Sequence, residues 1–260
     1  MTSERRVLVY PDKQTLTAAV ATRFLTTVVD LLAEQPLVHV AVTGGSVGIG
    51  VLASINASEA RDLIDWARLH IWWGDERWLP RGDAERNETQ ARVALLDHVA
   101  IGTETVHPFP VPLILDDLAG VELDSAALAY AAALRSFALP GAEVPVFDIT
   151  FLGVGPDGHV ASLFPDAAGI RVADRTVIAV RNSPKPPSER LSLSLGAINT
   201  SRRVWMVLAG ADKAAALGLA LAGADPVAVP VAGVLGDQTL FFVDAAAATN
   251  VPAELIFPAL

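Results

Sequence analysis

The chain has 260 residues, of which 52% are hydrophobic, and this apolar content is enough for a large buried core and excludes a disordered chain. Its formal net charge of -10 argues against nucleic acid or an anionic membrane surface as a partner. The absence of cysteine excludes a disulfide framework and a thiolate metal site.

Two further observations concern the compartment. No uninterrupted apolar run reaches the roughly 18 residues that a membrane span requires. Residues 1–6 lead directly into a strand-like run, without the apolar core of a signal peptide. We therefore expect a cytoplasmic protein.

Strand and helix patterns alternate along the first part of the chain. Short apolar runs rich in β-branched or aromatic residues predict buried strands, and apolar residues spaced by three or four predict helices. The patterns predict strands at residues 6–10, 37–42 and 69–73, and helices at residues 13–34 and 49–55.

The second predicted strand opens into a turn formed by Gly44, Gly45 and Ser46. Between a strand and a helix, a glycine-rich turn lets backbone N–H groups approach an anion at the helix N-terminus. An ordinary tight turn is an equally good interpretation. The turn matches neither the dinucleotide fingerprint GxGxxG nor the phosphate loop GxxxxGK(S/T), so neither nucleotide motif is present.

The third predicted strand ends in a turn that carries Asp75, Glu76 and Arg77. Three charged residues directly after a strand with two tryptophans are unusual for a merely solvated loop. The alternative is an ion cluster on the surface, which is the usual role of a charge run. Both interpretations stay open at this point.

Two more helices are predicted at residues 89–99 and 125–137, on either side of a proline-broken connection at 107–114. A short apolar run at 147–154 then predicts another buried strand. It ends in the sequence GPDG at residues 155–158, a strong turn signal whose glycines can adopt positive φ.

His159 follows this turn directly. Open α/β sheets bind ligands at the carboxyl ends of their strands, and the unperturbed pKa of histidine lies near neutrality, as a general base requires. A lone histidine is more often structural than catalytic. We interpret His39, His70, His98 and His107 in that structural sense and single out His159.

The last part of the chain continues the alternation. It predicts strands at residues 176–180, 191–195, 204–208 and 239–243, an extended proline-rich loop at 181–190, a short helical turn at 196–201 and a helix at 214–222. Strands alternating with helices are typical of an α/β three-layer fold. No repeat of 20–50 residues and no linker occurs, so we predict one domain over residues 1–260.

Residues 153–165 read GxGxDGHxASLFP, and this string resembles the signature of the 6-phosphogluconolactonase family, within the larger group that includes glucosamine-6-phosphate deaminases. Further similar motifs occur in the family's order: Gly-Gly-Ser at 44–46, Asp-Glu-Arg at 75–77, Pro-Lys-Pro-Pro at 184–187 with Arg190, and Gly210-x-x-Lys213. The resemblance implies a single-domain three-layer sandwich with a mostly parallel, Rossmann-like sheet, similar to the glucosamine-6-phosphate deaminase and ribose-5-phosphate isomerase type of fold.

The resemblance also implies a reaction, the hydrolysis of 6-phospho-D-glucono-1,5-lactone to 6-phospho-D-gluconate in the oxidative pentose phosphate pathway. We expect His159 to activate water as general base and then to protonate the leaving ring oxygen. Asp75 or Arg77 is expected to orient His159 or the substrate. The backbone N–H groups of residues 44–46 are expected to stabilise the oxyanion or to contact the substrate phosphate.

The phosphate monoester needs local cations, because the overall charge repels it. Lys213 is the first choice, since it lies at the start of a predicted helix where its charge and the helix dipole act together. Arg190 and Lys185 are second choices, and Arg77 could contact either end of the substrate. Many family members follow Gly-Gly-Ser with Thr-Pro; here Val47 and Gly48 follow, so this turn lacks one hydroxyl donor.

We expect no cofactor and no metal, because the histidines and carboxylates lack ligand spacing such as HExxH. The expected partner is the small phosphosugar lactone, with no nucleic acid, no membrane and a monomeric or weakly homo-oligomeric state. One alternative is an amino-sugar-phosphate isomerase or deaminase, which typically continues the histidine motif with IAFNEP where this chain has VASLFP. The other is a non-catalytic sugar-phosphate-binding protein, which would not need His159.

Overall fold

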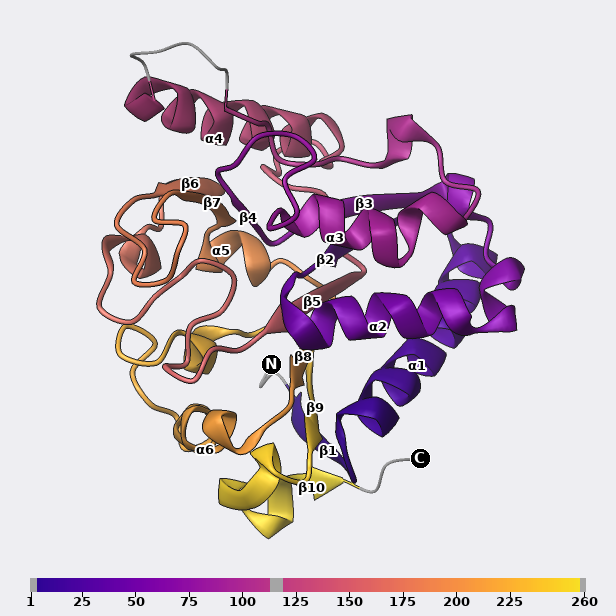
Figure 1. Ribbon diagram of the computed structural model, residues 1–260, viewed down its shortest axis with the longest axis vertical. Coiled ribbons are helices and arrows are strands. Elements are labelled where there is room, and N and C mark those ends of the chain that lie inside the picture. The colour runs from indigo at the N-terminus through magenta and orange to yellow at the C-terminus, as the bar shows by residue number, and fades with distance from the viewer. Residues whose placement is uncertain (1–3, 113–118, 258–260) are drawn as a thin grey trace.

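A computed structural model describes residues 4–112 and 119–257 of the chain (Figure 1). Its larger sheet contains strands β1 (Glu4–Tyr10), β2 (Val38–Val42), β3 (Leu69–Trp73), β5 (Ile149–Gly153), β8 (Arg203–Leu208), β9 (Gln238–Asp244) and β10 (Ile256–Phe257). A smaller sheet contains β4 (Asp75–Arg77), β6 (Val177–Val180) and β7 (Arg190–Leu193).

The larger sheet has the order β10-β1-β9-β8-β5-β2-β3, and all its strand pairs are parallel. The smaller sheet has the order β4-β7-β6 and is antiparallel. The strands of the larger sheet are nearly continuous apolar runs, as expected where both faces are covered. This confirms the mostly parallel α/β architecture.

The α-helices are α1 (Lys13–Glu34), α2 (Gly45–Ala57), α3 (Asn87–Ala94), α4 (Ala119–Ser136), α5 (Leu195–Ile198) and α6 (Ala214–Leu221). Figure 1 shows α1 and α2 together on one side of the large sheet and α6 on the other. α4 packs against β6 and β7 of the small sheet. Helices therefore cover both faces of the parallel sheet, as a layered α/β fold requires.

In the described part of the chain, α1 has the length and apolar composition of a membrane-spanning helix. The count of uninterrupted apolar residues overlooked it, because polar residues break its sequence. The polar residues lie along one side of the helix, and the other side is buried against the sheet. There the ring of Phe24 packs against the ring of Phe151 in β5, with 5.7 Å between the two ring centroids. We therefore interpret α1 as a core helix of the fold. Asp12 caps it by accepting the backbone N–H of Thr15 at 2.8 Å.

Most predicted elements are present, with four differences. Residues 75–77, predicted as a turn, form strand β4, and β10 was not predicted at all. The helix predicted to start at residue 49 begins at Gly45, so the glycine-rich turn is itself the first turn of α2. The predicted helix at 89–99 is α3 followed by a short 3-10 turn. Residues 1–3 and 113–114 of the predicted segments lie outside the described residues.

The strand order decides where the motifs meet. β8, β5, β2 and β3 are consecutive neighbours in the large sheet and all run in one direction. Their carboxyl ends therefore lie along the same edge. The chain segments that leave these four strands carry the glycine-rich turn, the Asp-Glu-Arg motif, the histidine turn and the lysine at the start of α6.

Candidate active site

A cavity of about 400 Å³ lies at this edge of the sheet. It brings together all nine residues that the sequence singled out, although they come from five separate segments of the chain. They are Gly44, Gly45, Ser46, Asp75, Arg77, His159, Lys185, Arg190 and Lys213. Asn87, Ala161 and Asp212 also line the cavity.

His159 is presented by a tight turn after β5. The N–H of Gly158 donates to the carbonyl of Gly155 at 3.0 Å, and the N–H of Gly155 donates to the carbonyl of His159 at 2.9 Å. Gly158 has a φ of +82°, a conformation that favours glycine, whereas Gly155 does not have a positive φ. The turn thus closes on itself and projects the imidazole toward the cavity.

Asp157 is the hydrogen-bond partner of His159. Its Oδ1 lies 2.5 Å from Nδ1 of the imidazole, so the ionised carboxylate accepts the Nδ1 proton and leaves Nε2 with a free lone pair. The sequence interpretation expected Asp75 or Arg77 to orient His159 or the substrate. In the structure Asp157 forms the hydrogen bond to His159, and the orientation of the substrate by Asp75 or Arg77 stays a prediction.

Burial lowers the pKa of His159 below its usual value of 6.5, and the hydrogen bond and charge of Asp157 oppose this shift. Lys185 adds to the lowering, since its Nζ lies 3.5 Å from Nδ1 of His159. The same ammonium lies 3.9 Å from Oδ1 of Asp157. The imidazole is therefore held neutral at neutral pH, which is the protonation state of a general base.

Asp75 is bound from two sides. Its Oδ2 accepts the hydroxyl of Ser162 at 2.7 Å, and Asn87 Nδ2 donates to its backbone carbonyl at 2.8 Å and to Oδ1 at 3.3 Å. Asp75 is 6% exposed, Asn87 2% and Ser162 1%, so this is a rigid buried group at the wall of the cavity. Asp75 also raises the pKa of His159 through its charge.

The glycine-rich turn packs closely on Asn87. A Cβ added at Gly44 would lie 1.9 Å from Oδ1 of Asn87, so only glycine leaves room for this contact. Gly48, which stands in a position where family members often have proline, would bring a Cβ within 2.7 Å of the backbone carbonyl of Thr43. Gly48 is therefore required by packing, and Ser46 supplies the side-chain hydroxyl of this turn.

Two arginines on the cavity wall make contacts with the protein itself. Arg190 donates from Nε to the carbonyl of Pro187 at 3.1 Å and from Nη2 to the carbonyls of Lys185 and Pro186 at 3.2 and 2.9 Å. Arg77 donates from Nη1 to the carbonyl of Glu85. Arg190 thus holds the proline-rich loop that carries Lys185.

Lys213 precedes α6, and its side chain is 20% exposed. Its Nζ donates to Oδ2 of Asp212 at 2.8 Å, and this bond lowers the pKa of that carboxyl. The loop before it is held by Asp244, whose two carboxylate oxygens each accept the N–H of Gly210 at 3.0 Å. Gly210 has a φ of +105°, so the turn that delivers Lys213 depends on glycine.

Sequence reasoning did not include Asp157, Asn87, Ser162 or Asp212 among the site residues. Asp157 and Ser162 lie within the histidine string, and their spacing from His159 was a usable signal. Asn87 follows the Asp-Glu-Arg motif by ten residues and resembles the asparagine that family members have before the next helix, so a signal for it existed. No local pattern connects Asp212 to the site. Among the described residues, no group of three or more histidines and carboxylates is arranged to hold a metal ion.

Comparison with known proteins gives a consistent result. The family model described as glucosamine-6-phosphate isomerases/6-phosphogluconolactonase matches residues 11–242. The 6-phosphogluconolactonase of Streptomyces coelicolor is 47% identical over 100% of this chain and 99% of that protein. The 6-phosphogluconolactonase of Mycobacterium tuberculosis is 43% identical over 94% of this chain and 98% of that protein.

Solved structures agree in fold. That of 6-phosphogluconolactonase from Trypanosoma brucei has a TM-score of 0.82 at 27% identity, covering 96% of this chain and 100% of that one. A monomeric glucosamine-6-phosphate deaminase has a TM-score of 0.76 at 17% identity, covering 94% of this chain and 99% of that one. The second likeness concerns the fold alone.

Proposed function

The chain belongs to the glucosamine-6-phosphate isomerase/6-phosphogluconolactonase family, and on this premise we propose that it hydrolyses 6-phospho-D-glucono-1,5-lactone to 6-phospho-D-gluconate in the oxidative pentose phosphate pathway. Relatives that are 43–47% identical over nearly their whole length carry the name 6-phosphogluconolactonase. The observation that carries the proposal is the neutral His159, bonded to Asp157, in a cavity that also holds cations.

In the proposed reaction, Nε2 of His159 takes a proton from water as the water oxygen attacks the lactone carbonyl carbon. A tetrahedral oxyanion forms, and the bond between this carbon and the ring oxygen then breaks. The imidazolium returns its proton to the ring oxygen, which becomes a hydroxyl group. The carbonyl carbon becomes a carboxylic acid, which loses its proton at neutral pH. A positioned base of this kind contributes roughly 10² to 10⁴-fold.

The remaining cavity residues suit the two ends of this substrate. Lys213 and Lys185 are proposed to bind the phosphate. Burial lowers the pKa of Lys185 and the charge of Lys213 lowers it further, so an anion near both lysines is favoured. Arg77 and Asp75 are proposed to position the sugar ring. The backbone N–H groups of Gly44, Gly45 and Ser46 are proposed as oxyanion or phosphate donors.

A deaminase acting on an amino-sugar phosphate is the rival within the same fold. The continuation of the histidine motif disfavours it, because residues 160–165 read VASLFP and lack the adjacent Asn-Glu pair. A sugar-phosphate-binding protein is the rival outside catalysis. It would need the lysines of the cavity, whereas a histidine with a lowered pKa and an ordering carboxylate serves proton transfer.

We further propose that residues 1–260 act as one lactonase domain, because β1 near the start of the chain pairs with both β9 and β10 near its end. The activity is assigned to the cytoplasm, since a phosphorylated sugar does not cross membranes unaided. A monomer or a weak homo-oligomer is proposed, because a single chain supplies all nine site residues of the cavity.

The test is hydrolysis of freshly generated 6-phosphogluconolactone. Its rate is measured as the formation of 6-phosphogluconate, and the rate of spontaneous ring opening is subtracted. We expect His159→Ala to lower kcat/KM by about 10² or more, because it removes the base. His98→Ala is the matched control, since the side chain of His98 is exposed, lies outside the cavity lining and hydrogen-bonds to the carbonyl of Val93. A wild-type protein that binds the phosphosugar without consuming the lactone would overturn the lactonase assignment.

A further inference from the structure

Glu76 lies between two residues of the cavity wall but faces away from the cavity. Side chains alternate along a strand, so Asp75 and Arg77 of β4 point to one side and Glu76 to the other. Glu76 is 1% exposed. It therefore cannot touch the substrate, and its charge calls for a different explanation from that of its two neighbours.

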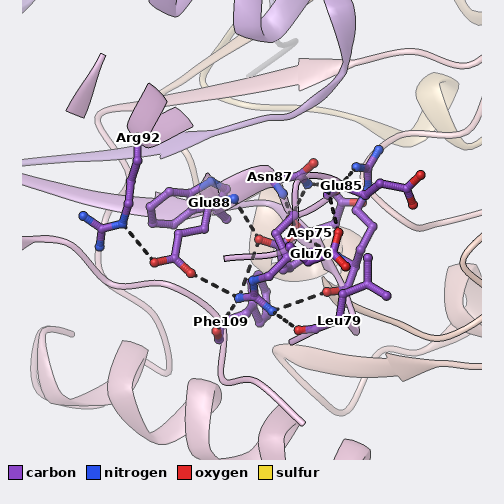
Figure 2. Close-up of polar contacts among 12 residues, drawn as sticks. Asp75, Glu76, Leu79, Glu85, Asn87, Glu88, Arg92 and Phe109 are labelled. Carbon is purple, nitrogen blue, oxygen red and sulfur yellow. Dashed lines mark hydrogen bonds and ion pairs between the residues drawn. The ribbon is translucent and has the colours of Figure 1, made fainter. Parts of the chain in front are cut away.

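The carboxylate of Glu76 accepts three backbone N–H groups (Figure 2). Oε1 accepts the N–H of Arg77 and that of Asn87, both at 2.7 Å, and Oε2 accepts the N–H of Glu88 at 2.9 Å. The first of these groups belongs to β4 and the other two to the first turn of α3. One buried carboxylate thus joins the strand and the helix.

The start of α3 has no local substitute for this contact. Its N-cap position is occupied by Arg86, which makes no side-chain capping bond to the helix in the described part of the chain. The first N–H groups of a helix need acceptors, and a negative charge there also interacts favourably with the helix dipole. A serine or aspartate at position 86 would cap the helix, but it would not hold the helix against β4.

Arg86 neutralises the buried charge. It is fully buried, and its Nη2 lies 3.7 Å from Oε2 of Glu76 and 3.3 Å from Oε2 of Glu88. It also donates to the carbonyls of Leu79 at 3.0 Å and Phe109 at 2.9 Å. Burying such a pair has a large desolvation cost and adds little net stability, so its stability alone does not account for this arrangement.

We propose that Glu76 is a positioning residue of the active site, which sets Arg77 and Asn87 in register with each other and with Asp75. Asn87 bonds to both the backbone and the carboxylate of Asp75, so any shift of α3 against β4 moves all three cavity residues. A misplacement of about 1 Å can cost about 10²-fold in rate. This inference rests on the lactonase function for its kinetic test.

The test compares Glu76→Gln with Glu88→Gln. Glu88 is also buried and also pairs with Arg86, but its carboxylate contacts only Arg86 and Arg92 in the described structure. We expect Glu76→Gln to lower kcat by about 10²-fold with KM changed by less than about threefold, because the lysines that bind phosphate are untouched. Glu88→Gln is expected to keep kcat within about threefold.

A double-mutant cycle separates positioning from general destabilisation. If Glu76 acts through Asn87, the loss caused by Glu76→Gln shrinks at least about tenfold in an Asn87→Ala background. Additive losses, or equal kinetic losses in the two glutamine variants, would overturn the proposal. If Glu76→Gln does not fold, Glu76→Asp replaces it, because the aspartate keeps the charge opposite Arg86 and withdraws the oxygens from the N–H groups.

Hydrogen exchange gives a reading that does not depend on activity. The amides of Arg77 and Asn87 are expected to exchange faster in Glu76→Gln than in Glu88→Gln, with the rest of the sheet unchanged. Unchanged protection of these two amides would refute the positioning role of Glu76 even if the lactone is hydrolysed. A wild-type protein without lactonase activity would instead refute the proposed function. The exchange comparison would still decide whether Glu76 holds the amides of Arg77 and Asn87.

Discussion

His159 can take its observed position because residue 155 has no side chain. A Cβ at Gly155 would lie 2.0 Å from Nδ1 of His159 and 2.4 Å from Oδ1 of Asp157. The space beside the turn is therefore used for the imidazole and its carboxylate partner. At the scale of single residues, this turn both shapes the backbone and determines the protonation of the base.

The pH dependence of the reaction follows from the neighbours of His159. Lactone hydrolysis needs the neutral imidazole, so kcat/KM falls as the pH drops through the pKa of His159, which lies below 6.5. Asp157 raises this pKa and Lys185 lowers it. We expect Asp157→Asn to move the acidic limb of the kcat/KM profile to lower pH, and Lys185→Met to move it to higher pH.

Both variants also lose rate, roughly 10²-fold for Asp157→Asn because the imidazole is no longer oriented. At each pH the rate of spontaneous hydrolysis, which rises at alkaline pH, is measured without enzyme and subtracted. Shifts of the same sign in the two variants would contradict the assignment of His159 as the base between these two charges.

At the scale of elements, the active site depends on segments that are tied to each other rather than on regular structure alone. Arg190 opens β7 and binds three carbonyls of the loop that carries Lys185. Asp244, the last residue of β9, accepts the N–H of Gly210 and that of Ala247. The loop that carries Lys185 is thus held by a buried guanidinium that donates to its carbonyls, and the loop before Lys213 is held by a buried carboxylate that accepts a backbone N–H.

Arg190→Lys tests whether this arginine binds phosphate or holds the loop. The single nitrogen of a lysine cannot replace both Nε and Nη2, which bind these carbonyls from two positions, so we expect a stability loss of about 1–3 kcal/mol and a rise in KM of about tenfold. If the arginine acts through the loop, the KM effects of Arg190→Lys and Lys185→Met are less than additive. Fully additive effects would favour direct contact between Arg190 and the phosphate.

At the scale of the whole molecule, the net charge of -10 and a phosphorylated substrate are compatible because the charges are unevenly placed. Four cationic side chains and two carboxylates line the cavity. The cationic ones are Arg77, Lys185, Arg190 and Lys213. The protein thus offers a local positive environment while its overall field repels nucleic acid.

A cluster of histidines on the large sheet makes the whole fold sensitive to acid. His70 Nδ1 lies 2.9 Å from His107 Nε2, and His39 Nδ1 accepts the indole N–H of Trp72 at 3.2 Å. Burial lowers the pKa of His39 and of His107 to about 4 and also lowers that of His70. The sequence interpretation of these histidines as structural agrees with this packing.

The sign of the effect follows from linkage. Between pH 6.5 and about 4 the unfolded chain binds protons that the folded chain resists, so the free energy of unfolding falls as the pH falls. We expect the urea midpoint to drop from pH 6.5 to pH 5, a window in which ordinary carboxylates stay ionised. His107→Gln should reduce this drop and His98→Gln should not. An unchanged drop in His107→Gln would contradict the role of the cluster.

Much of this protein could be predicted from its sequence. Apolar periodicity determined the order of strands and helices, because burial of one face forces that spacing; α1 and β3 were predicted with their observed bounds. Parallel strands end on the same edge of a sheet, so motifs placed after strands were expected to meet, and all nine site residues do line one cavity.

Only the tertiary structure decided the contacts between distant segments. Strand β4 is too short for a periodic pattern, and it exists because Asp75–Arg77 pairs with β7 more than a hundred residues later. The bond between Asp75 and Ser162 spans 87 residues, and Glu76 reaches α3 across a loop. Such contacts depend on packing in three dimensions, and no local propensity encodes them, which is why the partners of the site residues appeared only with the fold.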